Sequence, residues 1–430
     1  MEDPRRLVPR TDVVLADPRL APGIERLGLT RVKVALGPAL TRCRAGDIAP
    51  EDVVDEVLGK LPESPGGLRP VINATGVVVH TNLGRAPLSL AAREALALAA
   101  GSTDVELDLA TGQRGPRGRS ALAALARAVP DAEDVLIVNN GAAALSLVAH
   151  ALAWGREIVV ARGELVEIGN GFRIPDLLES SGAVLREVGT TNRVHLADYA
   201  DAISDATALV LKVHPSNFTV AGFTASAGAA QLATLPVPVV VDIGSGLLQP
   251  HRRLPREPDA RTSLRAGAAL VTASGDKLLG GPQSGLVLGR AEMVARMRRH
   301  PVARAFRVDK LTLAALEATL EGPPSPVALA LSTTRGELLD RARAISDALG
   351  DAIDSEAVPT TAMVGGGGAP GVELESAAVT LPERLARMLR TARPAVLGRV
   401  DRGRLLLDLI AVDPSYDASI IDAVRNSSRE

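Results

Sequence analysis

The sequence contains few cysteines and few aromatic residues, and both scarcities limit what the protein can do. A single cysteine, Cys43, excludes a disulfide within the chain and a metal site built from cysteines. Aromatic residues make up only 2% of the 430 residues, so surfaces on which nucleic-acid bases could stack are scarce. A net charge of −2 gives no overall attraction for a phosphate backbone, which leaves that role to local basic patches.

Long apolar runs are also absent. No stretch reaches the roughly 20 apolar residues that a membrane-spanning helix needs. The first residues, Met-Glu-Asp-Pro-Arg-Arg, lack the apolar core of a signal peptide. We therefore expect a cytoplasmic protein with no membrane contact. A hydrophobic content of 46% with 23% charged residues is ordinary for a soluble globular chain, and its length predicts two or three domains.

Two segments rich in proline and glycine divide the chain. Residues 62–67 (Pro-Glu-Ser-Pro-Gly-Gly) and 321–326 (Glu-Gly-Pro-Pro-Ser-Pro) are typical of turns and linkers. We predict an N-terminal helical domain at 1–68, a large catalytic domain at 69–320 and a small domain at 321–430.

The N-terminal domain is expected to contain helices over residues 23–43 and 49–61. Between Arg26 and Arg44 there are five basic residues and no acidic one. This pattern fits a solvated helix face, and it also fits a patch that faces RNA.

From residue 71 onward, short apolar runs alternate with helical patterns. Runs rich in valine, isoleucine and leucine occur at 135–138, 158–161, 208–213, 237–241 and 268–272. Such alternation predicts an α/β fold, with a mostly parallel sheet covered by helices on both faces. A smaller α+β domain is expected to follow. Ligands of such folds bind at the carboxyl ends of the strands.

One lysine, Lys277, stands directly after the last of these runs, within Ser-Gly-Asp-Lys-Leu-Leu-Gly-Gly-Pro at 274–282. A lysine at the exit of a buried strand packs poorly, but its amine can condense with the aldehyde of pyridoxal phosphate. Ser274 stands where a hydroxyl could reach the cofactor phosphate. Lys277 is therefore the candidate cofactor lysine.

Two further segments suit the same cofactor. Asn140, Gly141 and Ala142 open a helix after a strand, and free amides there can bind a phosphate, although such junctions are common. Asp242 ends an apolar strand, where it could hold the protonated ring nitrogen, ligate a metal or cap a helix. Since no companion ligands occur at metal spacing, we expect no metal. A phosphate loop followed by a strand-end aspartate and a strand-end lysine is typical of pyridoxal-phosphate enzymes with the aspartate-aminotransferase fold.

Basic residues gather again between positions 290 and 310. Arg304 and Arg307 are spaced to face one anion together, and guanidinium groups suit a tetrahedral oxyanion. The arginines at 296–299 are better explained as a surface helix face. His80, His195 and His214 have no serine or cysteine partner pattern, and we interpret each as structural.

Longer motifs resemble the bacterial selenocysteine synthases, the L-seryl-tRNA(Sec) selenium transferases. Residues 72–85 (Ile-Asn-Ala-Thr-Gly-Val-Val-Val-His-Thr-Asn-Leu-Gly-Arg) are similar to the opening signature of this family. The resemblance continues at residues 162–169, 172–175, 187–192, 212–217, 274–285 and 300–310.

The resemblance implies a fold-type-I enzyme with pyridoxal 5'-phosphate on Lys277. It would convert L-seryl-tRNA(Sec) to L-selenocysteyl-tRNA(Sec) through an aminoacrylyl intermediate, with selenophosphate as the selenium donor. The resemblance assigns Arg85, Arg304 and Arg307 to selenophosphate and a catalytic role to Asp276. It also implies tRNA binding by the N-terminal domain and a homo-oligomer built as a ring of dimers, a decamer.

Two alternatives stay open. Related pyridoxal-phosphate lyases act on small amino acids or amino sugar phosphates, but they would not need residues 1–68 with their basic patch. A catalytically silent tRNA-binding or scaffold protein would not need Lys277, Asp242 and the three arginines.

Overall fold

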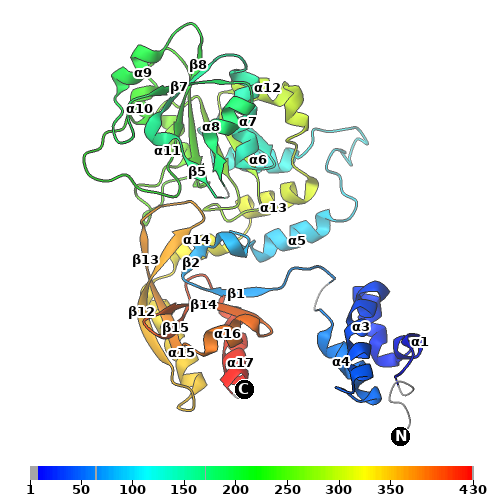
Figure 1. The fold of residues 1–430 in the computed structure, drawn as a ribbon. Coiled ribbons are helices and arrows are strands. Elements are labelled where there is room, and N and C mark those ends of the chain that lie inside the picture. The colour runs from blue at the N-terminus through cyan, green and yellow to red at the C-terminus, as the bar shows by residue number, and fades with distance from the viewer. Residues whose placement is uncertain (1–7, 63–64, 170, 429–430) are drawn as a thin grey trace. The chain divides into compact units, whose positions relative to one another are not determined.

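The computed structural model describes residues 8–62, 65–169 and 171–428, which fall into two compact units (Figure 1). The first unit ends at Val71 and the second begins at Ile72. Residues 1–7 and 63–64, which belong to the predicted N-terminal domain and its linker, lie outside the described ranges. The predicted boundaries at 68 and 320 stay a prediction. No helix in the described ranges is long and apolar enough to cross a membrane.

The first unit is helical. Its elements are α1 (Thr11–Leu15), η2 (Pro18–Leu20), α2 (Ala21–Leu27), α3 (Leu29–Ala45), η3 (Pro50–Asp52) and α4 (Val53–Lys60). Apolar side chains from α3 and α4, among them Leu36 and Val57, form its core. The single helix expected over 23–43 is two helices, because Gly28 adopts a φ of +83° that ends α2 and redirects the chain.

The second unit contains a seven-stranded sheet. In sheet order its strands are β3 (Asp134–Val138), β11 (Gly285–Gly289), β10 (Leu270–Ser274), β9 (Val239–Gly244), β8 (Thr207–Val213), β4 (Glu157–Ala161) and β7 (Val184–Val188). All neighbours run parallel except β11, which is antiparallel to both β3 and β10. The predicted runs thus become adjacent strands of one mostly parallel sheet.

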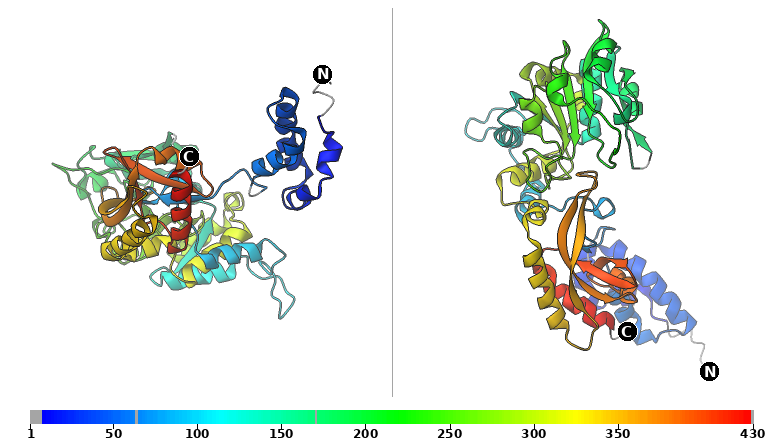
Figure 2. Two further views of the ribbon diagram at one scale, coloured as in Figure 1. Left: turned by 90° about the horizontal axis from the view of Figure 1, so that it is seen from below. Right: turned by 90° about the vertical axis from the view of Figure 1, so that its left-hand side faces the viewer.

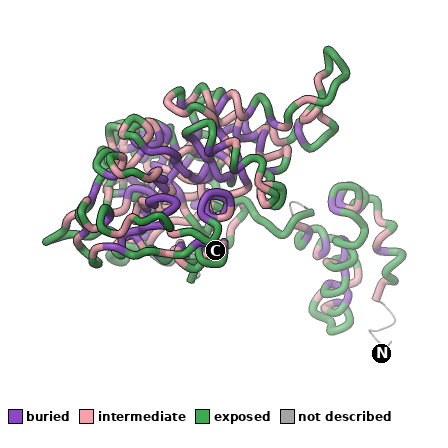
Figure 3. The backbone as a smooth tube through the Cα atoms, turned by 90° about the horizontal axis from the view of Figure 1, so that it is seen from above, coloured by how far each residue is buried: buried purple, intermediate pink, exposed green. Residues whose placement is uncertain are grey.

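Helices cover both faces of this sheet, as the two views of Figure 2 show. One face packs against α6 (Arg119–Ala128), α9 (Leu196–Ala202), α10 (Ala229–Leu232), α11 (Ala260–Arg265) and α13 (Lys310–Glu321). The other packs against α7 (Gly141–Leu152), α8 (Ile174–Ser180) and α12 (Ala291–Arg299). Along β9, Val239 and Val241 face the first layer and Val240 the second, as strand alternation requires. Strands β4, β8, β9, β10 and β11 are consequently almost wholly buried, whereas the edge strand β7 is largely exposed. Buried residues (purple) are concentrated in the interior of this unit in Figure 3.

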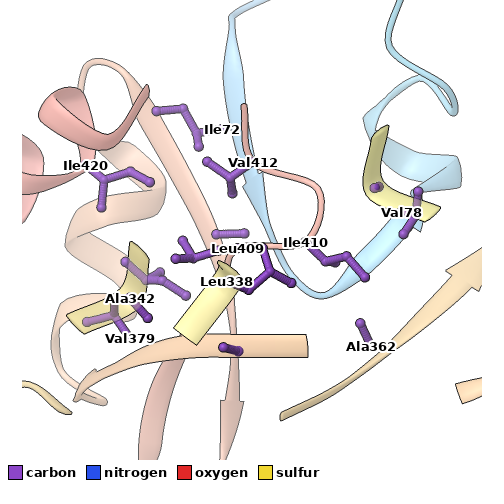
Figure 4. Packing of buried hydrophobic residues seen from close by; sticks show 14 of the residues in the cluster. Ile72, Val78, Leu338, Ala342, Ala362, Val379, Leu409, Ile410, Val412 and Ile420 are labelled. Atoms are coloured by element: carbon purple, nitrogen blue, oxygen red, sulfur yellow. The ribbon is translucent and has the colours of Figure 1, made fainter. Parts of the chain in front are cut away.

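A six-stranded sheet forms the other half of this unit. In sheet order its strands are β1 (Val71–Ala74), β14 (Ala395–Asp401), β15 (Arg404–Asp408), β13 (Glu373–Pro382), β12 (Glu356–Gly365) and β2 (Val77–Val79). It packs with α14 (Pro326–Ser332), α15 (Arg335–Leu349), α16 (Leu385–Thr391) and α17 (Asp417–Ser428). Figure 4 shows Leu338, Val379 and Ile420 among the buried side chains of this core.

The sheet thereby joins residues 71–79 to residues 356–408. A partly buried ion pair holds this junction: Arg399 Nη1 lies 3.0 Å from Oδ2 of the buried Asp408 and donates to the Thr75 carbonyl at 2.8 Å. Gly76 has a φ of +81°, and a Cβ there would lie 2.0 Å from Arg399 Nη1. The Asn-Ala-Thr-Gly motif at 73–76 is therefore the turn that sends the chain through β2 toward Arg85.

Candidate active site

Lys277 and Asp242 lie at the carboxyl edge of two adjacent parallel strands. Asp242 is in β9, its register partner in β10 is Thr272, and Lys277 follows the end of β10. Asp242 is 9% exposed, and Thr272 donates its hydroxyl to Asp242 Oδ1 at 2.8 Å. The structure therefore brings the predicted acid and the predicted lysine to one place.

Burial governs the protonation of both groups. It lowers the pKa of Lys277, while the nearby carboxylates of Asp242 and Asp276 act in the opposite direction. Burial also raises the pKa of Asp242, against the hydrogen bond from Thr272 and the charge of Lys277. A lysine amine with a lowered pKa is more readily available as a free base, which imine chemistry requires.

Arg85 is also beside Lys277. It forms an ion pair with the buried Asp276, and the Ala86 amide donates to the Asp276 carbonyl at 3.3 Å. Arg85 has a φ of +68° directly after the short helix η4 (Thr81–Leu83). Its charge contributes to the low pKa of Lys277. Asp276 thus anchors the segment that carries Arg85 next to the lysine.

The predicted phosphate loop reaches the same edge of the sheet. Asn140 caps α7, since its side-chain oxygen accepts from the Ala143 amide at 2.8 Å. A Cβ on Gly141 would lie 2.7 Å from Ser274 Oγ, so only glycine leaves the helix start open toward that hydroxyl. Asn140, Gly141, Ala142 and Ser274 are therefore neighbours. Helix amides, a hydroxyl, a buried carboxylate and a buried amine are the groups that fit pyridoxal phosphate.

Arg304 and Arg307 lie close to each other, in surroundings that differ from those of Lys277. The Asn139 amide donates to the Phe306 carbonyl at 3.1 Å, which ties this segment to the end of β3. Both arginines line a cavity of about 750 Å³ whose lining, among the described residues, does not include Lys277 or Arg85. Arg307 Nη1 is 3.6 Å from Glu106 Oε1. The structure thus places these two arginines together and leaves them apart from the Lys277 group within one chain.

Two polar residues near Lys277 were not among the predicted site residues. His214, interpreted as structural, follows β8, and its amide donates to the Asp242 carbonyl at 2.9 Å. Burial, Lys212 and Lys277 lower the pKa of His214 to about 4. Its Nε2 is 3.7 Å from Oε2 of Glu257, a buried residue whose pKa burial raises. The position of His214 at the end of a strand could have marked it as a candidate site residue from the sequence alone. Glu257 lies in a loop whose sequence has no recognisable pattern.

Metal ligation has no support in this part of the fold. Across the described ranges, no group of three or more histidine, cysteine, aspartate or glutamate side chains is arranged to hold a metal ion.

The chain matches the family model described as L-seryl-tRNA selenium transferase over residues 71–413. It belongs to this family. Curated relatives that carry the name L-seryl-tRNA(Sec) selenium transferase span almost the whole chain. The protein of Moorella thermoacetica is 42% identical over 97% of this chain and 96% of its own. That of Geobacter sulfurreducens is 41% identical over 92% of both chains, and that of Hyphomonas neptunium is 40% identical over 98% of both.

A solved structure of D-glucosaminate-6-phosphate ammonia-lyase shares the fold. The TM-score is 0.60 at 22% identity, over 84% of this chain and 96% of the other. The predicted fold class, a fold-type-I α/β architecture with a mostly parallel sheet, is confirmed, as is the predicted family. Fold and family together indicate an enzyme that depends on pyridoxal phosphate.

Proposed function

We propose that this protein converts L-seryl-tRNA(Sec) to L-selenocysteyl-tRNA(Sec), with selenophosphate as selenium donor. The observation that carries the proposal is the partly buried Lys277 near the buried Asp242 and the predicted phosphate loop, in a chain that aligns with relatives of this name over nearly its full length. A cytoplasmic location is part of the same proposal.

Each cofactor group has a partner of suitable chemistry. Lys277 would hold the pyridoxal-phosphate aldehyde carbon and Asp242 the protonated ring nitrogen. The α7 amides at Gly141 and Ala142, with the Ser274 hydroxyl, would hold the phosphate. When bound, the cofactor supplies an electron sink for the charge that develops at the substrate Cα.

The protein side chains then supply proton transfer and orientation. Lys277 Nζ, when free, would take the proton from the seryl Cα, and its lowered pKa favours the free base that this requires. Asp276 keeps Arg85 beside this amine through their ion pair. Arg85 binds the selenium donor as a tetrahedral oxyanion, which a guanidinium suits.

Arg304 and Arg307 complete the donor site in this proposal. Because they line a cavity that Lys277 does not line within one chain, we propose that a second subunit supplies them to the site. This requirement supports a homo-oligomer built from dimers, for which we propose the decameric ring.

The first unit is proposed to bind the tRNA. Arg26, Arg31, Lys33 and Arg44 are exposed on this unit, whereas Arg42 pairs with Glu56. Since aromatic residues are few, we expect recognition through the phosphate backbone and the shape of the RNA.

The deciding experiment incubates the purified protein with seryl-tRNA(Sec) and selenophosphate and analyses the amino acid released from the tRNA. Selenocysteine is expected. Free L-serine and amino sugar phosphates serve as competing substrates. Turnover of one of these without conversion of the tRNA-bound serine would replace the proposal with the lyase alternative.

A further inference from the structure

The segment after β12 has an unusual backbone. Gly365, Gly366 and Gly367 have φ values of +75°, +61° and +79°, and Ala369 has +46°. The left-handed region costs glycine little, but it is unfavourable for alanine, whose Cβ approaches the backbone. A loop so rich in glycine is also free to adopt many other conformations. One bond within the loop, from the Gly368 amide to the Gly365 carbonyl at 3.1 Å, supports a turn, and contacts from outside the loop must select the rest of its conformation.

This glycine loop, residues 365–369, lies directly against the cofactor lysine. A Cβ on Gly367 would be 3.8 Å from Lys277 Nζ and 3.5 Å from the Ser216 Cβ. A Cβ on Gly368 would be 3.2 Å from Leu278 Cδ1. The loop thus packs on the lysine and its neighbour, and its backbone closes one side of the space around the amine.

One buried side chain fastens the loop from the opposite half of the unit. Glu257, in the loop that follows β9, accepts the Ala369 amide proton at Oε2 over 2.8 Å. The bond is buried, and it acts on the one alanine in the left-handed region. The His214 ring packs against the same carboxylate oxygen at 3.7 Å, which limits its movement away from the loop.

One atom beside this bond points to a further occupant. His214 Nδ1 is buried and has no hydrogen-bond partner among the residues that the structure describes, whereas the Ser245 hydroxyl lies beside the Glu257 carboxylate and opposes the rise in its pKa that burial causes. Buried polar atoms in folded proteins are normally satisfied. A polar group of the substrate or an ordered water beside the His214 ring would meet this need.

We propose that Glu257 is a positioning residue that holds the glycine loop over Lys277. This role rests on the proposed function, because the amine that the loop covers is the one to which we assign proton transfer. Glu257 acts on the lysine through the loop: with the bond in place, the loop shields the amine from bulk water. Without it, the glycine segment leaves its left-handed conformation and the amine becomes accessible.

The test uses the full-length protein without cofactor, so that its result does not depend on selenium transfer. Hydrogen exchange of the peptide covering 364–372 reports loop order, and acetic anhydride labelling of Lys277, relative to the exposed Lys33, reports amine access. In Glu257→Ala we expect exchange of the loop amides at least about tenfold faster and Lys277 labelled several-fold faster. In Glu257→Gln the amide oxygen still accepts from Ala369, so both rates should stay near wild type.

The matched control is Glu164→Gln. Glu164 is also buried and accepts a backbone amide, that of Val213, at 2.9 Å, but its hydrogen bonds go to Lys212 and Val213 and not to the loop. Its substitution should leave exchange at 364–372 unchanged. Glu257→Asp keeps the charge, but its shorter side chain moves the acceptor oxygen away from the Ala369 amide, so it should also loosen the loop. It replaces Glu257→Ala if the alanine variant does not fold. Unchanged loop exchange in a folded Ala or Asp variant, or a Gln variant as loose as Ala, would overturn the proposal.

Discussion

Thr272 on β10 donates its hydroxyl to Asp242 on the neighbouring parallel strand β9, at 2.8 Å. The two residues are register partners, so the bond is built into the pairing of the strands. It stabilises the carboxylate against the rise in pKa that burial causes. A side chain of the strand that leads to Lys277 thus favours the ionised form of the ring-nitrogen partner proposed for the cofactor.

Thr272→Val, which has nearly the same shape, should therefore raise the pKa of Asp242 further and weaken cofactor binding. A lost hydrogen bond to a charged group costs about 1.5 kcal/mol or more, so we expect the dissociation constant for pyridoxal phosphate to rise about tenfold. Titration of the cofactor-free protein by absorbance measures this. Thr272→Ser keeps the hydroxyl and should bind as the wild type does. Equal affinity of the Val variant would contradict the role of the bond.

Replacement of Lys277, the proposed cofactor lysine, should remove two properties together. Lys277→Ala cannot form an imine, so the visible absorbance of the loaded protein and the conversion of seryl-tRNA should both disappear. The exposed Lys60→Ala is the control and should retain both. A Lys277→Ala protein that keeps its imine band after gel filtration would show that another lysine holds the cofactor.

Gly141→Ala tests the phosphate loop. The new methyl group would meet Ser274 Oγ at 2.7 Å, so thermal stability and cofactor affinity should both fall, the affinity by about tenfold. Adding Ser274→Ala removes that oxygen and leaves the Ser274 Cβ position at 3.9 Å, an ordinary contact. The double variant should regain stability but not affinity, because the hydroxyl is lost. Melting temperatures and cofactor titrations separate the two effects.

Stability should fall on acidification partly through His214. The pKa of His214 is about 4 in the folded protein and 6.5 ordinarily, so between these values the unfolded chain binds a proton that the folded chain does not. Falling pH therefore favours unfolding, by about 2 kcal/mol between pH 7 and pH 5. The raised pKa of Glu257 acts in the opposite direction and offsets part of this. In urea unfolding, His214→Gln should lose a smaller part of its stability over this range than the wild type does.

If subunits share active sites, two inactive variants should rescue each other. Lys277→Ala and Arg304→Ala, each inactive alone, would regain part of the activity after co-expression, because some sites would receive an intact lysine and an intact arginine. Arg335→Ala, which removes a partly exposed pair with Glu375, is the control and should be active alone. A mixture without activity would place both residues in a site made by one chain.

Much of the site followed from the sequence because it lies where strands end. Asp242, Lys277 and Gly141 each follow or close an apolar run, and parallel strands bring such positions to one edge. Arg85 and Asp276 were assigned only through the family resemblance, since the ion pair joins positions far apart in the chain.

Glu257 could not be found in the same way. Its role arises from a contact with Ala369 across the two halves of the unit, which no local pattern records. The break of the first long helix at Gly28 was missed because the apolar pattern continues on both sides of the glycine.

The strand order of the six-stranded sheet means that this sheet can be completed only late in synthesis. Strands β1 and β2 leave the ribosome early, but their partners β14 and β12 follow only near the end of the chain. Until then, the apolar residues at 71–79 have no sheet to join, and the loop that covers Lys277 does not yet exist. We therefore expect the nascent chain to expose these apolar residues until the final strands are released and to be prone to aggregation during that time.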